Sequence, residues 1–64
     1  MPGPDDGDGE VYFEFRPVGA SVKVSAIHAK TGMEVSVVGP ASAARADLQR
    51  LALQKLRARL KSGG

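Results

Sequence analysis

Few side chains in this sequence have a type and spacing that suggest chemistry. His28 is the single histidine among 64 residues that include no cysteine. A histidine that acts as a general base needs a nucleophile or an orienting carboxylate nearby. If residues 21–28 form a strand, His28 shares its apolar face with Val22. The nearest acid in sequence, Glu34, belongs to the next predicted strand, residues 33–38, and falls on the polar face of that strand. We therefore expect His28 to close one end of a core and the protein not to be an enzyme.

Patterns for nucleophilic, phosphate and metal chemistry are also missing. The serines have no neighbouring base to activate them. The stretch VVGPAS at residues 37–42 opens a helical segment but has neither the glycine run nor the lysine of a phosphate-binding loop. Four acids near the N-terminus do not follow the spacing of a calcium loop; they are Asp5, Asp6, Asp8 and Glu10. No catalytic residue, cofactor or metal site is predicted.

Positive charge gathers in the last third of the chain. The segment LQRLALQKLRARLK at residues 48–61 mixes leucines with basic side chains, and after residue 40 a single acid, Asp47, faces six cations. Basic residues late in a helix complement the negative end of its dipole, so a solvated face is one interpretation. Weak binding to the phosphates of double-stranded RNA or DNA is the alternative. The cations assigned to that contact are Arg45, Arg50, Arg57 and Lys61.

Three segments with period-two alternation must position these side chains. VYFEFR at residues 11–16, SVKVSAIH at 21–28 and MEVSVV at 33–38 place apolar residues on one face and mostly polar residues on the other. This alternation is typical of an antiparallel meander with one dry face, predicted here over about residues 10–38. The residues predicted to face inward are Val11, Phe13, Phe15, Val22, Val24, Ala26, Met33, Val35 and Val37.

The connections between these segments predict the strand register. Residues 17–20 (PVGA), taken as a four-residue loop, pair Glu14 with Lys23. That register sets apolar residues against each other on one face and an acid opposite a base on the other. Residues 29–32 (AKTG) are predicted to form the second turn, in which Gly32 allows a left-handed backbone.

Residues 40–61 predict one helix that covers the dry face of the sheet. Pro40 suits a first helical turn, strong helix formers follow it, and SGG ends the helix. Because the sheet requires its leucines, membrane binding is not expected. A helix of about 22 residues is ~33 Å long against ~20 to 25 Å for the strands, so its last turns should project. Leu56 and Leu60 would then need a partner, either another protein or a second copy of the chain.

Length and composition limit the organisation of the chain. Sixty-four residues suffice for one domain, which we predict to be an α+β unit (βββα) over residues 10–62. Residues 1–9 are rich in proline, glycine and aspartate and predict a disordered acidic tail. No apolar run of signal-peptide or membrane-span length is found, so a cytoplasmic location is expected. The expected function is a small non-enzymatic interaction module of unknown partner.

Two family resemblances accompany these patterns. Three antiparallel strands followed by a long helix resemble the C-terminal part of the double-stranded-RNA-binding domain, but Ala43 and Ala44 stand where that family has phosphate-binding lysines. Residues 10–61, through VKVSAI, TGMEVSVVGP and the following helix, resemble a family of short uncharacterised bacterial proteins, mainly alphaproteobacterial. This second resemblance implies the same fold and offers no activity to carry over.

Overall fold

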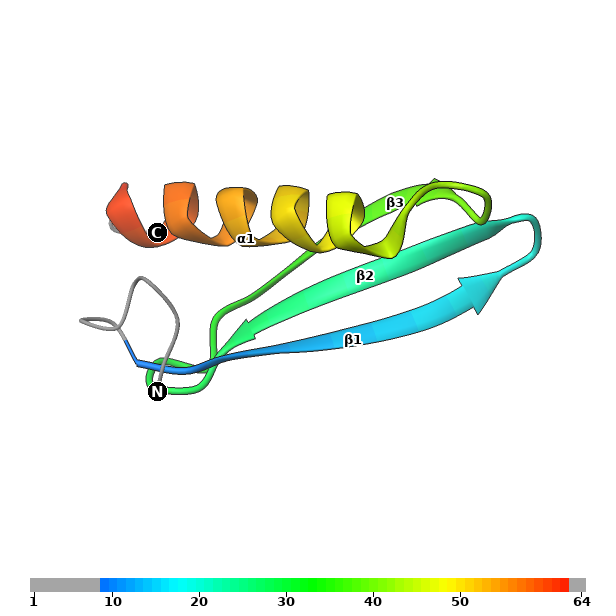
Figure 1. The fold of residues 1–64 in the computed structure, drawn as a ribbon. Coiled ribbons are helices and arrows are strands. Elements are labelled where there is room, and N and C mark those ends of the chain that lie inside the picture. Colours follow the sequence, from blue (N-terminus) through cyan, green and yellow to red (C-terminus); the bar gives the residue numbers. More distant parts are fainter. Residues whose placement is uncertain (1–8, 63–64) are drawn as a thin grey trace.

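The computed structural model describes residues 9–62 and contains three strands and one helix. They are β1 (Val11–Val18), β2 (Ser21–His28), β3 (Glu34–Pro40) and α1 (Arg45–Lys61). The strands form one antiparallel sheet in the order β1-β2-β3, and α1 lies along one face of it (Figure 1). The predicted α+β meander with a C-terminal helix is confirmed. The tail predicted at residues 1–9 lies outside the described residues, apart from Gly9.

The core lies between α1 and the two strands β2 and β3. Three helix residues spaced by four positions form the buried stripe of α1, as the helical period requires. The small side chains Ala26 on β2 and Ala52 on α1 are fully buried, so the helix approaches the sheet closely. The buried apolar residues are Val22, Val24, Ala26, Val35, Leu48, Ala52 and Leu56.

The first turn contains two residues, where the sequence predicted four. β1 continues to Val18, and only Gly19 and Ala20 connect it to β2. Gly19 has a φ of +60°. A positive φ at the first central residue alone is the signature of a type II′ turn, which matches the twist of a tight hairpin and favours glycine. The hairpin is therefore tighter and longer than predicted.

The shorter turn shifts the register of β1 against β2 by two residues. Glu14, predicted to pair with Lys23, lies opposite Ser25, and Arg16 lies opposite Lys23. The predicted pairing is wrong, yet every side chain keeps its predicted face because faces alternate with period two. The physical reason is Pro17, a common turn residue that here lies in an edge strand. An edge tolerates proline where the missing N–H faces away from the neighbouring strand.

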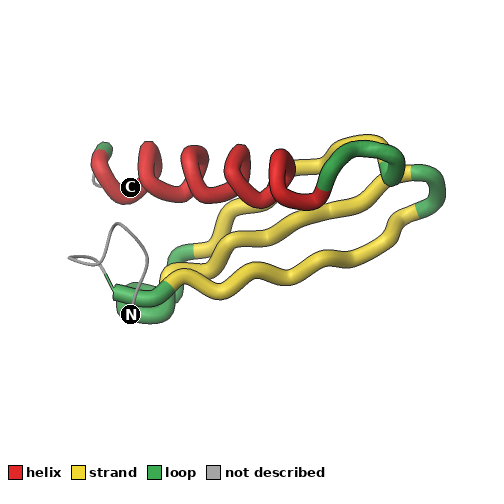
Figure 2. The backbone as a smooth tube through the Cα atoms, viewed as in Figure 1, coloured by secondary structure: helices red, strands yellow, loops and turns green. Residues whose placement is uncertain are grey.

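The helix begins at Arg45, five residues after the predicted start. Pro40 is the last residue of β3, and residues 41–44 connect the strand to the helix. With 17 residues, α1 is about 25 Å long, close to the about 26 Å of the eight-residue β2. The helix is offset along the sheet, however, so its C-terminal end still extends beyond the ends of the strands, as predicted (Figure 2). Leu56, expected in that projection, is fully buried in the core.

The second turn closes one end of the core. His28 is buried, and its Nδ1 lies 2.8 Å from the hydroxyl of Thr31, which stands in the turn. The N–H of Gly32 donates to the carbonyl of His28 at 2.7 Å, and Gly32 has a φ of +77°. Met33, predicted within a strand, precedes β3 and packs against the core from the turn. His28 thus occupies the place at the end of the core that the sequence predicted.

Gly39 permits the close approach of the helix to β3. A Cβ atom at this position would lie 2.6 Å from Cδ2 of Leu48, far inside van der Waals contact. Leu48 is itself buried, so its side chain has little room to move. The glycine in a strand that otherwise favours β-branched residues is therefore explained by packing.

Candidate interaction surface

The helix leaves the inner face of β1 partly uncovered. It packs mainly on β2 and β3, and β1 is the strand farthest from it in Figure 2. It reaches β1 through Arg45, which lies over the ring of Phe15. Val11, Phe13 and Phe15 point to the core side of β1 but are only half-buried, and they pack against the edge of the core. We call these three residues the β1 strip. Two aromatic rings and a valine thus border the region that α1 does not cover.

Alternate residues of β1 also point their backbone groups away from the sheet. Val18 and Ser21 flank the two-residue turn, and the residue pair at such a turn exchanges backbone hydrogen bonds. The backbone N–H and C=O groups of the even-numbered residues of β1 therefore point toward β2. Glu10 follows the same pattern, since its carbonyl accepts the N–H of Ala29 at 3.0 Å. The N–H and C=O groups of Phe13 and Phe15 therefore point outward, and within residues 9–62 nothing is bonded to them. The β1 strip consequently borders an open strand edge.

The opposite edge of the sheet, along β3, is partly occupied. Its outward residues are the even-numbered ones, which include Ser36 and Pro40. Lys55 of α1 donates from Nζ to the carbonyl of Ser36 at 2.8 Å, and Pro40 has no N–H to donate. A lysine or a proline on an edge discourages pairing with another strand. Of the two edges, β1 is the one left available for pairing.

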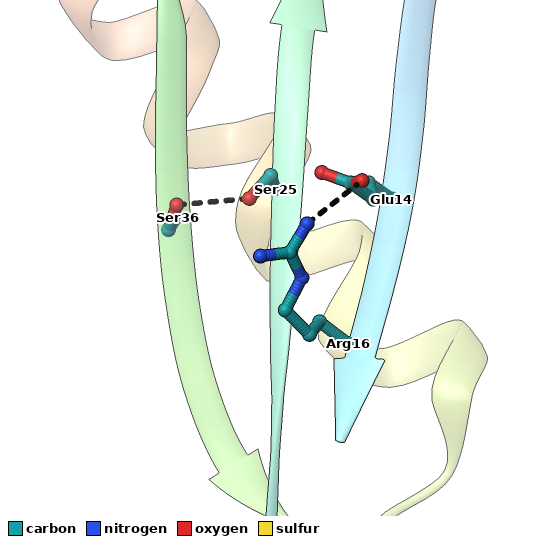
Figure 3. Close-up of polar contacts among 4 residues, drawn as sticks. All are labelled: Glu14, Arg16, Ser25 and Ser36. Carbon is teal, nitrogen blue, oxygen red and sulfur yellow. Dashed lines mark hydrogen bonds and ion pairs between the residues drawn. The ribbon is translucent and has the colours of Figure 1, made fainter. Parts of the chain in front are cut away.

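The outer face of the sheet is mostly polar, although Val18 and Val38 are exposed on it, and four of its polar side chains form two pairs (Figure 3). Arg16 and Lys23 are directly opposed like charges, and Glu14 compensates them by pairing with Arg16 at 3.3 Å. The buried hydroxyl of Ser25 finds its partner in Ser36 at 3.0 Å. A shallow open depression of about 140 Å³ is lined by Glu14, Arg16, Lys23, Ser25 and Glu34. These contacts give hydrogen-bond partners to the side chains that form them, and they bring no nucleophile together with a base.

Tyr12 and Glu10 form a second polar pair on the exposed side of β1. The Tyr12 hydroxyl donates to Oε1 of Glu10 at 2.9 Å. This hydrogen bond, and then the negative charge of the carboxylate, raise the pKa of Tyr12 above its usual value of 10.0. Phenolate formation removes the donated proton and sets two negative charges side by side, so alkaline pH weakens this contact.

We predict that Glu10→Gln lowers the pKa of Tyr12 toward its ordinary value. Tyr12 is the only tyrosine of the chain and there is no tryptophan, so phenolate absorbance reports this group alone. Because the folded-state pKa is raised, the contact contributes stability that is present below the unfolded pKa and lost as pH rises through the folded one. An identical titration curve for wild type and Glu10→Gln would show that the pair does not form.

The four cations predicted to contact phosphate do not share one surface. Arg45 lies over the ring of Phe15, 5.1 Å from its centroid, on the sheet side of the helix. Arg50, Arg57 and Lys61, spaced by seven and four residues, form one stripe on the other side. Within that stripe Arg50 is paired with Asp47, Arg57 is half-buried, and Lys61 is exposed in the last turn. Three of the four predicted cations therefore share one stripe of α1, and Arg45 lies apart from it.

The two leucines predicted to meet a partner are placed differently from each other. Leu56 is core and cannot touch a partner, so this prediction is wrong. Leu60 is half-buried and packs against the core at the end of α1. The exposed leucine of the helix is Leu51, at 52%. The sequence did not predict the open edge of β1. The pattern that indicates it is a first strand of a meander, which has only one neighbouring strand but carries three inward apolar residues.

Neither a metal centre nor a membrane span is found in residues 9–62. No group of three or more potential metal ligands gathers in this part of the chain. The single helix described is too short and too polar to cross a membrane.

Three antiparallel strands with one helix across a single face define a two-layer α+β domain. The chain belongs to the family described as "Domain of unknown function (DUF6898)", whose model matches residues 8–63. The resemblance to a family of uncharacterised proteins is thus confirmed. No curated protein and no solved structure matches the chain.

Proposed function

We propose that this domain is a small non-enzymatic interaction module of the bacterial cytoplasm that binds other protein chains through β1. The observation that carries the proposal is the open edge at Phe13 and Phe15, next to apolar side chains that α1 leaves half-buried. An extended segment added to such an edge gains main-chain hydrogen bonds, and its alternate side chains cover the apolar face. The polar contacts of the outer face and the buried His28 supply no competing chemistry.

The energetics favour this surface over the charged helix. Burying an aromatic side chain fully contributes roughly 1.5 to 3 kcal/mol relative to exposure, and the two rings of the β1 strip are only half-buried. Exposed ion pairs contribute about 0 to 1 kcal/mol each. A partner that covers the strip therefore gains more than one that contacts the cations of α1.

Affinity capture with matched variants tests this proposal. Phe13→Lys places a charge on the open edge, whereas Leu51→Lys makes the same change on the exposed side of α1. We expect the partner to be retained by wild type and Leu51→Lys and lost by Phe13→Lys, with all three folded by circular dichroism. The purified partner should then shift the amide signals of residues 11–15 of the labelled domain. Equal retention by all three variants would refute a β1 binding surface.

The stripe of Arg50, Arg57 and Lys61 supports the alternative function, weak sequence-independent nucleic-acid binding. Phosphate contacts release counterions, so such binding weakens steeply with salt. If the alternative holds, amide shifts on adding short duplex RNA or DNA should be confined to α1, vanish at higher salt, and disappear in the double variant Arg50→Ala/Lys61→Ala. Both residues are exposed, so the fold should survive their replacement. A spectrum unchanged at low salt would eliminate this function.

A further inference from the structure

We propose that the partner for β1 is a second copy of the chain, joined by antiparallel pairing of the two β1 strands about a twofold axis at Phe13. This inference rests on the proposed interaction function and names its occupant. The pairing would unite two three-stranded sheets into one six-stranded sheet. Both helices would then lie on the same face, because a twofold axis perpendicular to the sheet preserves its sides.

Pro17 selects the register of this pairing. Its ring nitrogen lies on the outward side of β1 and has no hydrogen to donate, so a partner strand cannot form a full ladder there. The stretch free of proline is Val11–Phe15, and its centre is Phe13. Centred pairing sets Phe13 opposite its own copy and Val11 opposite Phe15. All outward N–H and C=O groups of these three residues then find partners, and Pro17 stays at the margin.

The side chains of β1 are complementary to themselves in the same register. On the outer face, Arg16 of one copy lies opposite Glu10 of the other, and Tyr12 lies opposite Glu14. Within one copy these four groups already pair along the strand, Arg16 with Glu14 at 3.3 Å and Tyr12 with Glu10 at 2.9 Å. On association, Arg16 and Tyr12 would each replace a glutamate of their own copy by a glutamate of the other copy. No donor of the exposed face would then lose its hydrogen-bond acceptor.

The apolar side of the strand is equally matched. The β1 strip of one copy meets the β1 strip of the other, so aromatic and β-branched side chains become cross-strand neighbours. The same arrangement through β3 is opposed by Lys55, whose ammonium group already binds the carbonyl of Ser36 on that edge. Charge complementarity and open backbone groups thus favour β1 as the edge that meets a second copy.

Sedimentation equilibrium of the 64-residue chain over a concentration series tests the association. We expect the apparent mass to rise with concentration from 6.7 kDa toward twice that value. Arg16→Glu opposes like charges across the axis and should weaken the dimer about tenfold or more, as should Glu10→Lys. The charge-swapped double variant Glu10→Lys/Arg16→Glu should recover most of the affinity. Lys61→Glu, the same charge change on α1, should leave the dimer unchanged.

The folding of these variants can be measured separately from their association. Arg16→Glu places a carboxylate opposite Lys23 within the same sheet, so the monomer should remain folded by circular dichroism. A constant monomer mass for wild type at every concentration would overturn the dimer. If Phe13→Lys still abolished capture of another protein in that case, the proposed function would stand without self-association. A dimer that Arg16→Glu and Glu10→Lys leave intact would overturn the β1 interface.

Single cysteines test the register, because the natural chain contains none. The proposed axis brings the two Phe13 Cα atoms to about 5.5 Å, within the range of a disulfide. The two Phe15 Cα atoms would be about 13 Å or more apart, since four residues of strand separate them along the sheet. We expect Phe13→Cys to cross-link faster than Phe15→Cys or the control Leu51→Cys. Faster cross-linking of Phe15→Cys would contradict the register.

Discussion

Leu56→Ala is expected to lower the free energy of unfolding by about 2 to 5 kcal/mol. Leu56 is fully buried between α1 and the sheet, so truncation removes its contacts and leaves a cavity. A domain of this size is expected to have a total stability of only about 3 to 10 kcal/mol. The variant should therefore be substantially unfolded at room temperature or show a strongly reduced midpoint in urea.

Leu51→Ala is the matched control for that prediction. Leu51 lies on the same helix with 52% of its surface exposed, and its truncation should change the stability by about 0.5 kcal/mol or less. Urea unfolding followed by circular dichroism measures both variants. If the two substitutions had equal effects, Leu56 would not be buried against the sheet while Leu51 is exposed, and Leu56 would be free to contact a partner after all.

Gly39→Val should destabilise the domain by about 1 to 3 kcal/mol, although valine is favoured in strands. Its Cβ would lie 2.6 Å from Cδ2 of Leu48, and its methyl groups add further volume. Either the leucine or the start of α1 must move away from β3. Urea unfolding of the variant beside wild type gives the magnitude.

A second substitution shows whether the clash with Leu48 is the cause. In the double variant Gly39→Val/Leu48→Ala the leucine is gone, so the added valine fills space instead of overlapping. The combined loss should be smaller than the sum of the two single losses, a coupling expected for residues in contact. Strictly additive losses, or a Gly39→Val protein as stable as wild type, would show that α1 does not pack against β3 at this point.

The strands were predictable because their burial follows a simple period. Alternate residues of a strand face opposite sides, so three alternating segments define a dry face whatever their exact pairing. Phe13 and Val24 accordingly lie on the side predicted for them, even though the register differs by two residues. The alternation constrains the face of each residue and leaves shifts by two undetermined.

The turn and the helix start depended on proline, whose position is ambiguous in sequence. Pro17 and Pro40 are compatible with a turn and a first helical turn respectively, and both instead lie in edge strands with their nitrogens outward. Whether a strand lies at an edge depends on the order of the strands in the sheet, and the local sequence around a proline does not reveal that order. The late start of α1 then shortened the helix and moved Leu56 from the expected projection into the core.

The candidate interaction surface was harder to predict than the fold. Its half-buried residues, such as Phe13 and Phe15, look like ordinary core residues in the sequence. They differ from core residues because α1 packs mainly on β2 and β3, where the small Ala26, Ala52 and Gly39 allow the helix to approach closely. The basic residues can be recognised in the sequence by their charge, whereas the location of an uncovered strand depends on packing.

Amide hydrogen exchange along β1 tests the central claim, an open strand edge that acquires a partner. In dilute protein, the amides of Tyr12 and Glu14 should be protected by β2, whereas those of Phe13 and Phe15 should exchange rapidly. Protection of Phe13 and Phe15 should appear as the protein is concentrated, or when a purified partner is added. Slow exchange of these two amides in dilute monomer would contradict the claim, because it would mean that the edge is already covered.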